Sequence, residues 1–251
     1  MHYTDEELRE VKAVLKNDDQ YYGDYGRQFL SNSDVSTLLY DPKEFRKPLE
    51  QTKAMIQGRY FHTAMLEPQK LDLYEVIDMA SRNTKIYKDA IAESGEEILL
   101  LTKEQEECML WVSKMKENIR FFDDIYEPGN KYEVPGVELI QGVWWKGKAD
   151  IITKDYIIDL KTTADIYKFG WSARKYNYDS QCYIYQQIFG KPLVFYCIDK
   201  STGVLGIFSP DDPFIQGGRD KVMRALEQYE KFYGEKATED PAHFIIEGTL
   251  I

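Results

Sequence analysis

The sequence contains few cysteines, no excess of positive charge and no long apolar run. Its 251 residues include three cysteines, Cys108, Cys182 and Cys197, which are widely spaced and form no Cys-X-X-Cys pair. This pattern indicates neither a disulfide framework nor a zinc site. We expect all three thiols to be reduced and to pack as small hydrophobic groups.

Positive charge is scarce for a protein that would bind nucleic acid. Acidic residues outnumber basic ones by 43 to 32, which gives a formal net charge of −11. Such an excess weakens long-range attraction to DNA, so the composition does not argue for DNA binding. Three features can reconcile this composition with DNA binding: a cluster of carboxylates neutralised by metal, a locally basic groove, and an acidic remainder that faces away.

Membrane and export signals are also missing from the sequence. No apolar run has the length of a membrane span, and the start, Met1 to Glu7, lacks the basic and apolar regions of a signal peptide. We therefore expect a cytoplasmic protein, in a bacterium or a phage-infected host. The length and the 43% share of hydrophobic residues suit one large globular domain, with or without a modest extension.

The most informative stretch, residues 147–163, is expected to form a β-hairpin. Ala149–Ile152 and Tyr156–Leu160 are short runs rich in apolar and β-branched residues, and the polar residues between them favour a turn. A turn centred between Lys154 and Asp155 pairs position 150 with 159 and position 148 with 161.

This register gives the hairpin a polar face and an apolar face. Asp150, Asp159 and Lys161 share the polar face because side chains alternate along a strand. The apolar face is predicted to carry Ala149, Ile151, Ile158 and Leu160. Opposed side chains lie roughly 5 Å apart at Cβ, so the two carboxylates repel each other unless a cation joins them. Mg²⁺ with oxygen ligands can supply that charge, and Lys161 adds another. An ordinary solvent-facing hairpin is the alternative.

Four short motifs in this order resemble those of the PD-(D/E)XK nucleases. They are Gly58-Arg-Tyr-Phe-His62, Gly147-Lys-Ala-Asp150, Asp159-Leu-Lys161 and Gln181-Cys-Tyr-Ile-Tyr185. The segment from Leu30 to Pro42 also resembles the opening helix of that family. The likeness is closest to the RecB-like branch and, within it, to phage and prophage RecE-type exonucleases.

The resemblance implies an α/β (α+β) fold with a restriction-endonuclease-like core, in which helices flank a central mixed β-sheet. On this basis we divide the chain into three parts. An N-terminal helix and loop extension covers residues 1–28, a nuclease domain covers 29–235, and a C-terminal tail covers 236–251.

The same resemblance implies a catalytic centre with two Mg²⁺ or Mn²⁺ ions. Asp150, Asp159 and Lys161 are its catalytic residues. The metal ligands are the two aspartates, His62 and the backbone carbonyl of Leu160. A single histidine on a helix is otherwise a structural residue, and that alternative is open for His62. Glu133 and Glu138, on the preceding strands, are candidates for outer-shell ligands.

Further residues are implied to contact the substrate. Gln181 and Tyr185 lie four apart on a helix and project together, which also suits a plain surface pair. Ser33 can hold a phosphate or merely cap its helix. The remaining predicted DNA contacts are Arg59, Arg174 and Lys175, each of which can instead be an ordinary solvated charge. A segment with Arg82, Lys85 and Lys88 is either a DNA-clamping arm or a solvated loop.

The implied activity is divalent-metal-dependent hydrolysis of linear duplex DNA by an exonuclease, in phage recombination or replication or in DNA degradation. Its partners would be duplex ends or single strands, a single-strand annealing protein, and further subunits in a ring. One alternative is a catalytically silent nuclease-fold module that binds DNA or protein. Another is an endonuclease with the same site.

Periodicity and capping residues predict the remaining elements. Residues 17–28 are expected to be a loop. Helices are expected at 4–16, from Ser31 or Ser33 to Pro42, and at 52–66, 101–126, 179–189 and 212–234, and strands at 131–140, 141–145, 193–199 and 204–208.

Overall fold

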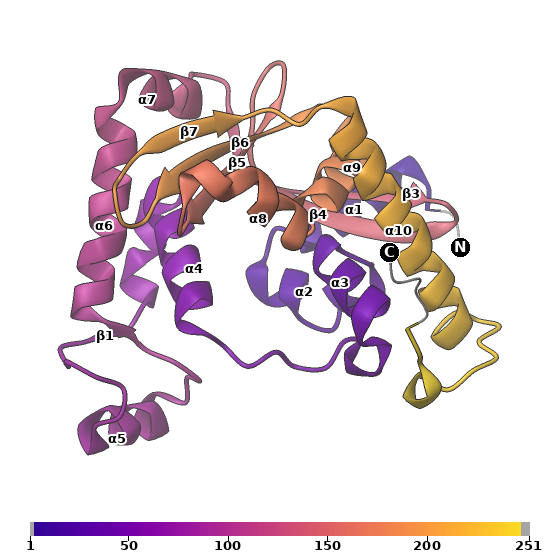
Figure 1. Ribbon diagram of the computed structural model, residues 1–251, viewed down its shortest axis with the longest axis horizontal. Coiled ribbons are helices and arrows are strands. Elements are labelled where there is room, and N and C mark those ends of the chain that lie inside the picture. Colours follow the sequence, from indigo (N-terminus) through magenta and orange to yellow (C-terminus); the bar gives the residue numbers. More distant parts are fainter. Residues whose placement is uncertain (1–2, 247–251) are drawn as a thin grey trace.

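A mixed five-stranded β-sheet lies at the centre of the computed structural model, which describes residues 3–246 (Figure 1). The strand order is β3-β4-β5-β6-β7, and only β5 and β6 are parallel neighbours. The strands are β3 (Lys131–Ile140), β4 (Val143–Ile152), β5 (Ile157–Thr163), β6 (Leu193–Asp199) and β7 (Leu205–Phe208). The predicted α+β fold with a flanked mixed sheet is confirmed.

Helices cover both faces of the sheet, which explains why β6 is a run of apolar and aromatic residues up to Ile198. Phe195 and Cys197 point into one core cluster, whereas Tyr196 and Ile198 point into the other. The first face is covered by α3 (Asn32–Tyr40), α8 (Phe169–Lys175), α9 (Tyr178–Phe189) and α10 (Asp212–Phe232). The second is covered by α4 (Lys53–Leu66), α6 (Thr102–Glu117) and α7 (Ile119–Tyr126).

The N-terminal extension packs on the sheet through a separate small core. Its first helix, α1 (Asp5–Val14), begins at the predicted Thr4 capping box. The expected loop at 17–28 is wrong in part, because Asp18–Tyr22 form a short helix, α2, and residues 26–28 a 3₁₀ turn. Asn17 caps α2, and Tyr21 is buried against the extension and β3. Burial of one aromatic ring thus orders a segment that its polar composition marks as a loop.

The predicted helix at 101–126 is two helices. Asn118 has extended backbone angles and its side chain caps α7 by accepting the Phe121 N–H, so the chain turns between α6 and α7. The helical spacing of Met109, Val112, Met115 and Ile119, on which the prediction of one helix depends, therefore does not mark a single buried face. Met109 and Ile119 are exposed, whereas Val112 and Met115 are buried as expected.

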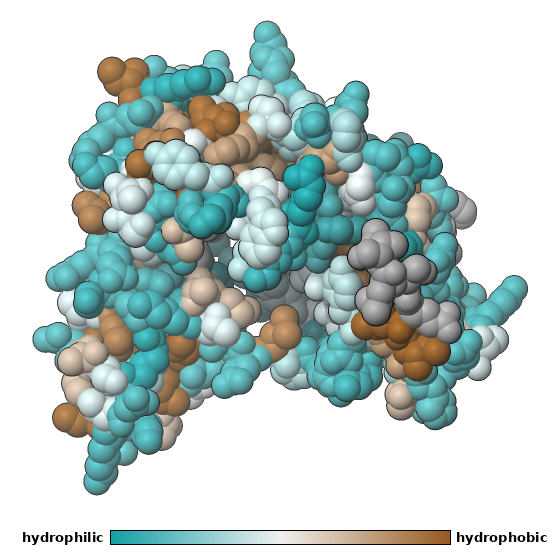
Figure 2. Space-filling model, in the orientation of Figure 1, coloured by the Kyte–Doolittle hydropathy of each residue, from teal (hydrophilic) through white to brown (hydrophobic). Residues whose placement is uncertain are grey.

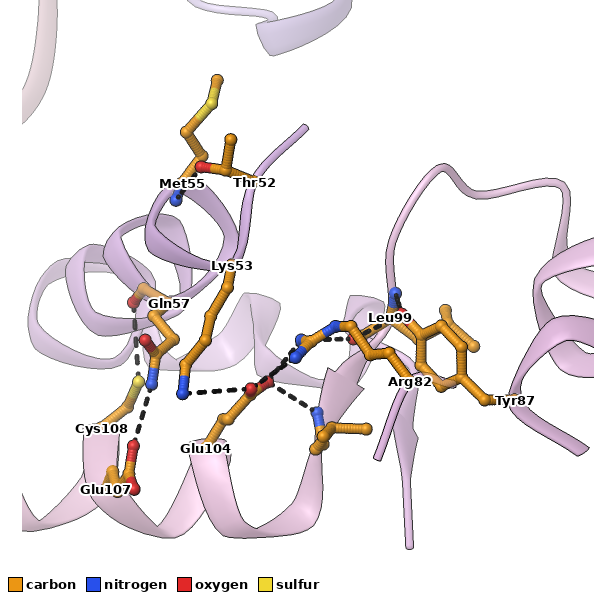
Figure 3. Close-up of polar contacts among 11 residues, drawn as sticks. Thr52, Lys53, Met55, Gln57, Arg82, Tyr87, Leu99, Glu104, Glu107 and Cys108 are labelled. Carbon is orange, nitrogen blue, oxygen red and sulfur yellow. Dashed lines mark hydrogen bonds and ion pairs between the residues drawn. The ribbon is translucent and has the colours of Figure 1, made fainter. Parts of the chain in front are cut away.

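An arm around α5 (Lys85–Ser94) projects from the lower left of the molecule (Figure 1). It is joined to the body by two short parallel strands, β1 (Val76–Ile77) and β2 (Leu100–Leu101). The carboxylate of Glu104 on α6 holds the arm and α4 together (Figure 3), because it accepts two bonds from Arg82, at 2.5 and 2.6 Å, and pairs with Lys53 at 3.3 Å. Glu104 is buried, so these cations offset the cost of desolvating its charge.

The α4–α6 contact is extended by two polar bonds from Gln57 (Figure 3). Its side-chain amide donates to Glu107 at 3.2 Å, and its backbone carbonyl accepts from the Cys108 thiol at 3.6 Å. These bonds fix the orientation of α4, the helix that carries His62.

Surface character agrees with the composition. The face shown in Figure 2 is mainly hydrophilic, with apolar residues in small groups. All three cysteines are free and buried, as expected for small hydrophobic groups. Within residues 3–246, no helix combines the length and the apolarity that crossing a membrane requires.

Candidate active site

The central hairpin has the predicted register near its turn but not beyond it. Ile151 pairs with Ile158 and Ile152 with Ile157. The regular ladder stops there, and the Asp150 carboxylate instead accepts the backbone N–H of Leu160 at 2.8 Å. In a strand, the N–H and C=O of one residue point toward the same neighbouring strand. The carbonyl of Leu160 therefore also faces the Asp150 side, where the predicted metal ligands gather.

Interruption of the ladder changes which residues share a face. Ala149 packs in the cluster that contains α9, whereas Ile151 packs in the cluster that contains α4 and α6. The predicted common face for these two residues is therefore wrong, because the pleat is interrupted at Asp150. Lys148 does not face Lys161 either, since its ammonium contacts the carboxylate of Asp18 on α2.

One half of the site, which we call the acidic half, consists of His62, Glu133 and Asp150. One ligand atom from each of these side chains lies within 4.8 Å of the others. Nδ1 of His62, on α4, is 3.3 Å from Asp150 Oδ2. Three separate elements, α4, β3 and β4, thus bring two carboxylates and an imidazole to one point.

Glu133 lies beside His62 and Asp150, whereas the sequence predicted it only as an outer-shell ligand. The two-residue turn at Gln141 and Gly142, both with positive φ, sets the register of β3 against β4. Counting back from that turn places Glu133 opposite Asp150, so the sequence alone could have predicted that the two carboxylates lie close together. Glu133 itself has φ of 49°, and its pairing with Asp150 is missing from the ladder. The other candidate, Glu138, is exposed near the far end of the strand.

The charges in the acidic half are poorly balanced. Burial and the nearby Asp150 raise the pKa of Glu133 to about 7. Burial also disfavours ionisation of Asp150, but His62, Lys161 and the Leu160 N–H hold the pKa of Asp150 below its usual value. Burial disfavours the charged form of His62, yet Asp150 raises the pKa of that imidazole. Within residues 3–246 Glu133 forms no salt bridge, and the charges of His62 and Lys148 oppose the rise in its pKa without cancelling it.

The second half, which we call the lysine half, consists of Asp159, Lys161 and Gln181. The Lys161 ammonium lies 2.5 Å from Asp159 Oδ2, and the Gln181 amide donates to Oδ1 at 2.6 Å. Burial and Asp150 raise the pKa of Asp159 although Lys161 opposes them. Burial would lower the pKa of Lys161, but Asp159 and other neighbours keep it above its ordinary value. The lysine therefore carries a permanent charge at neutral pH.

Tyr185 is buried one helical turn after Gln181 on α9. Its hydroxyl donates to the backbone carbonyl of Lys148 at 2.9 Å. The bond ties α9 to β4 two residues before Asp150. In this structure Tyr185 thus positions the strand, and its contact with substrate stays a prediction.

Two residues of the N-terminal extension, Asp18 and Tyr22, lie at the edge of the site, which we call the rim. None of the four sequence motifs contains them. Asp18 contacts Lys148, and the neighbouring Tyr22 lies 5.4 Å from the same ammonium. Tyr22 is 66% exposed, but the atoms packed near its hydroxyl and the carboxylates of Glu133 and Asp150 raise the pKa of Tyr22. Only the tertiary contacts could reveal this rim, because α2 lies more than 120 residues from β4.

The other predicted DNA contacts lie outside the two halves. Ser33 is exposed in the first turn of α3, where the Ser31 hydroxyl, not Ser33, forms the capping box with Asp34. Arg59 is exposed on α4 and donates to Gln51. Arg174 and Lys175 are exposed on α8, with Arg174 over the Phe214 ring at 5.2 Å. The structure leaves their predicted contacts with DNA as predictions.

The donor set of the acidic half fits a divalent cation. Carboxylate oxygens suit Mg²⁺ and Mn²⁺, and an imidazole nitrogen is tolerated better by Mn²⁺. The raised pKa of Glu133 also favours a cation here, because a half-buried and a buried carboxylate at this spacing require a positive charge to ionise together. Asp159, predicted as a ligand, is held by Lys161 and Gln181 in this structure.

Comparison with known proteins shows the family of the chain and a similar fold. A family model described as a PDDEXK-like domain of unknown function (DUF3799) matches residues 30–242. No curated protein matches the sequence. Among solved structures, a candidate exonuclease from Eubacterium rectale is similar, with a TM-score of 0.62 and 18% identity over 100% of this chain and 96% of that chain. An alkaline exonuclease from Laribacter hongkongensis matches with a TM-score of 0.37 and 15% identity over 84% and 92% of the two chains.

Proposed function

The chain belongs to the family of PDDEXK-like domains of unknown function (DUF3799), and from that premise we propose that it is a divalent-metal-dependent deoxyribonuclease. The substrate we propose is linear duplex DNA, degraded from its ends. The observation that carries the proposal is the convergence of His62, Glu133 and Asp150 beside the Asp159–Lys161 pair. The carboxylates of the acidic half and the ammonium of Lys161 would then face the same phosphodiester.

In this proposal His62, Glu133 and Asp150 hold Mg²⁺ or Mn²⁺, and the Leu160 carbonyl and Asp159 serve a second ion. A divalent ion in such a site supplies Lewis acidity toward a phosphate oxygen and lowers the pKa of water. The chain itself supplies the positions of these ligands. The Leu160 N–H fixes Asp150, and the packing of α4 on α6 fixes His62.

The lysine half has a different role. Because Lys161 stays protonated, its ammonium can stabilise the negative charge that develops on the phosphate oxygens. Gln181 keeps one oxygen of Asp159 occupied, so the other is directed at Lys161. Tyr185 keeps β4 in place through the Lys148 carbonyl.

The test compares linear and circular duplex DNA with Mg²⁺ for the wild type and for Asp159→Ala and Lys161→Ala. Matched controls are Asp155→Ala and Lys154→Ala, exposed charges in the turn of the same hairpin. We expect the wild type and both controls to degrade linear DNA and both site variants to fail. Cleavage without metal, or full activity in both site variants, would contradict the proposal.

Two other outcomes would redirect it. Cutting of circular DNA would identify an endonuclease with the same site. Tight DNA binding without turnover in Mg²⁺ or Mn²⁺ would identify a nuclease-fold binding module. The first outcome changes only the substrate, whereas the second removes the catalytic role.

We further propose the biological setting implied by the sequence resemblance. It comprises a cytoplasmic role in phage recombination or DNA degradation, a single-strand annealing protein as partner, and a ring of subunits around DNA. A ring would enclose the duplex and so offset the net charge of −11. Residues 29–235 would form the nuclease domain, and residues 1–28 an extension that contributes Asp18 and Tyr22 to the rim. Mass measurement in solution tests the ring.

A further inference from the structure

A group of aromatic and basic side chains lies exposed on α8 and the residues beside it. Trp171 is 65% exposed, Tyr176 57% and Tyr167 88%. Residues 166–178 contain Lys168, Arg174 and Lys175 but no aspartate or glutamate, although the chain as a whole is acidic. Figure 1 shows α8 on the side of the molecule turned toward the viewer. In Figure 2, residues of intermediate hydropathy, drawn in white, lie at its position among hydrophilic ones.

The exposure of these rings follows from how α8 is anchored. Phe169 and Ala173 are buried, and the Phe169 ring packs 4.6 Å from Phe208 on β7. Trp171 lies midway between these anchors in sequence, so the helix turns it away from the core. A ring left in water forgoes about 1.5–3 kcal/mol of burial energy, so folding gives no reason for this placement.

The exposed rings connect to the lysine half through a series of close contacts. The Lys161 ammonium lies 4.9 Å from the centre of the Tyr178 ring. The Tyr178 and Tyr176 rings are 6.2 Å apart, and the Lys175 ammonium lies 5.5 Å from the Tyr176 ring and 5.1 Å from the Trp171 ring. Aromatic surface therefore runs from the proposed catalytic lysine outward to solvent, with cations beside it.

Proteins that bind single-stranded nucleic acid combine these two features. Aromatic faces stack on unpaired bases, and basic side chains follow the phosphates. Paired bases inside a duplex present no open face for such stacking. We propose that Trp171 and Tyr176 bind unpaired bases of a DNA strand that adjoins the site, with Lys175 and Arg174 facing its phosphates. Lys168 contributes less, because Asp165 pairs with it at 2.9 Å.

The inference deepens the proposed function, since it names single-stranded DNA as the form in which a strand passes the site. It also separates binding from hydrolysis. The strand would leave the duplex before it reaches Lys161, and α8 would hold the unpaired bases. Binding to α8 requires no metal and can be measured in a chain that does not hydrolyse DNA.

The experiment measures binding of a fluorescent twelve-residue oligothymidylate by anisotropy, with EDTA present, to the full chain carrying Asp159→Ala. Trp171→Ala and Tyr176→Ala are added to this background singly and together. We expect each to weaken binding by roughly 5- to 100-fold, as loss of one stacked base predicts. Trp171→Phe keeps a ring and should bind within about threefold of the parent, since its face still stacks.

Phe122→Ala is the matched control, because Phe122 is an exposed ring on α7, on the opposite face of the sheet from α8. Its binding should equal that of the parent, and thermal unfolding checks that every variant is folded. Binding to a blunt duplex of the same length should change less than binding to the single strand. Tryptophan emission should also fall on binding and do so less in Trp171→Phe, because Trp111 and Trp145 are buried and Trp144 packs in the N-terminal core cluster.

Equal binding by the α8 variants and the control would overturn the inference, as would an equal loss of duplex binding. Tighter binding of oligouridylate would overturn DNA as the strand that is bound. The two proposals fail separately. A wild type that binds the oligonucleotide through α8 but never cuts DNA would contradict only the nuclease, and one that cuts DNA without using α8 would contradict only the stacking surface.

Discussion

The acidic half and the lysine half of the site solve the same electrostatic problem in different ways. Both place a carboxylate next to other charges, but Asp159 has an ammonium and an amide on its two oxygens. Glu133 forms no salt bridge within residues 3–246, and the nearby charges of His62 and Lys148 only partly oppose the rise in its pKa. The lysine half is complete as the chain folds. In the acidic half an added positive ion would let Glu133 and Asp150 ionise together, so we expect the tighter of the two proposed ions there.

The two halves are also built from different helices and strands. The lysine half comes from β5 and α9, which are separated by the segment that contains α8, and the acidic half comes from α4, β3 and β4. A substitution in the acidic half should therefore weaken metal binding. A substitution of Lys161 in the lysine half should slow turnover and leave metal binding nearly unchanged. The following predictions test that separation.

Asp150→Ala should have the largest effect, because it removes the carboxylate that joins His62, Glu133 and the Leu160 N–H. We expect hydrolysis of end-labelled linear DNA to fall by about 10³-fold or more. Mn²⁺ binding, measured by calorimetry, should be lost as well. Retained Mn²⁺ affinity would show that the acidic half is not the ion site, and Asp155→Ala provides the control.

Lys161→Ala should reduce kcat by roughly 10²- to 10³-fold, because it removes a fixed charge near the reacting phosphate. Mn²⁺ affinity should remain close to that of the wild type, since Lys161 belongs to the other half. Lys161→Arg should not restore full activity, because a planar guanidinium does not replace a compact ammonium. A parallel loss of ion binding and turnover would erase the distinction between the halves.

Ion affinity should depend on pH through Glu133. Below its pKa of about 7 the carboxyl is protonated and a cation must displace the proton, so Mn²⁺ affinity should fall by about tenfold per pH unit. Glu133→Gln should bind Mn²⁺ about 10- to 100-fold more weakly at pH 8 and show a shallower pH dependence, and the part that remains comes from protonation of His62, whose pKa is also raised. Calorimetry from pH 5.5 to 8.5 measures both, and an unchanged slope in the variant would refute the assignment.

The free energy of unfolding of the metal-free protein should fall with rising pH because of Glu133. A carboxyl whose pKa is raised by folding binds more protons folded than unfolded, so the free energy of unfolding falls as pH rises from the unfolded pKa to about 7. The total loss should be at most about 3 kcal/mol. Glu133→Gln should flatten this part of the curve in urea unfolding with EDTA. A steeper decline in the variant would contradict the raised pKa.

Tyr185→Phe should have the smallest effect. It removes one hydrogen bond to the Lys148 carbonyl and keeps the ring in the core, so it should cost about 1 kcal/mol of stability. Hydrolysis should fall less than tenfold, since only the position of β4 is loosened. A loss as large as that of Lys161→Ala would instead indicate a direct role in the reaction.

Local patterns in the sequence determined much of the fold. Thr4, Ser31 and Thr52 cap the helices that their spacing predicts, and apolar residues near Thr153 set the hairpin register. These features depend on side chains within a few residues of one another. The resemblance to PD-(D/E)XK nucleases rested on four such local motifs, and the family match and the fold confirm it.

Contacts between distant segments decided the rest. Burial of Tyr21 beside Lys146 on β4 made a helix of a polar stretch, and Asn118 divided a helix whose periodicity continues across it. The interruption at Asp150 moved Ala149 to the other face and left Glu133 beside His62. Short-range periodicity carries no record of such contacts, because their energy comes from burial and charge that appear only when the strands and helices meet.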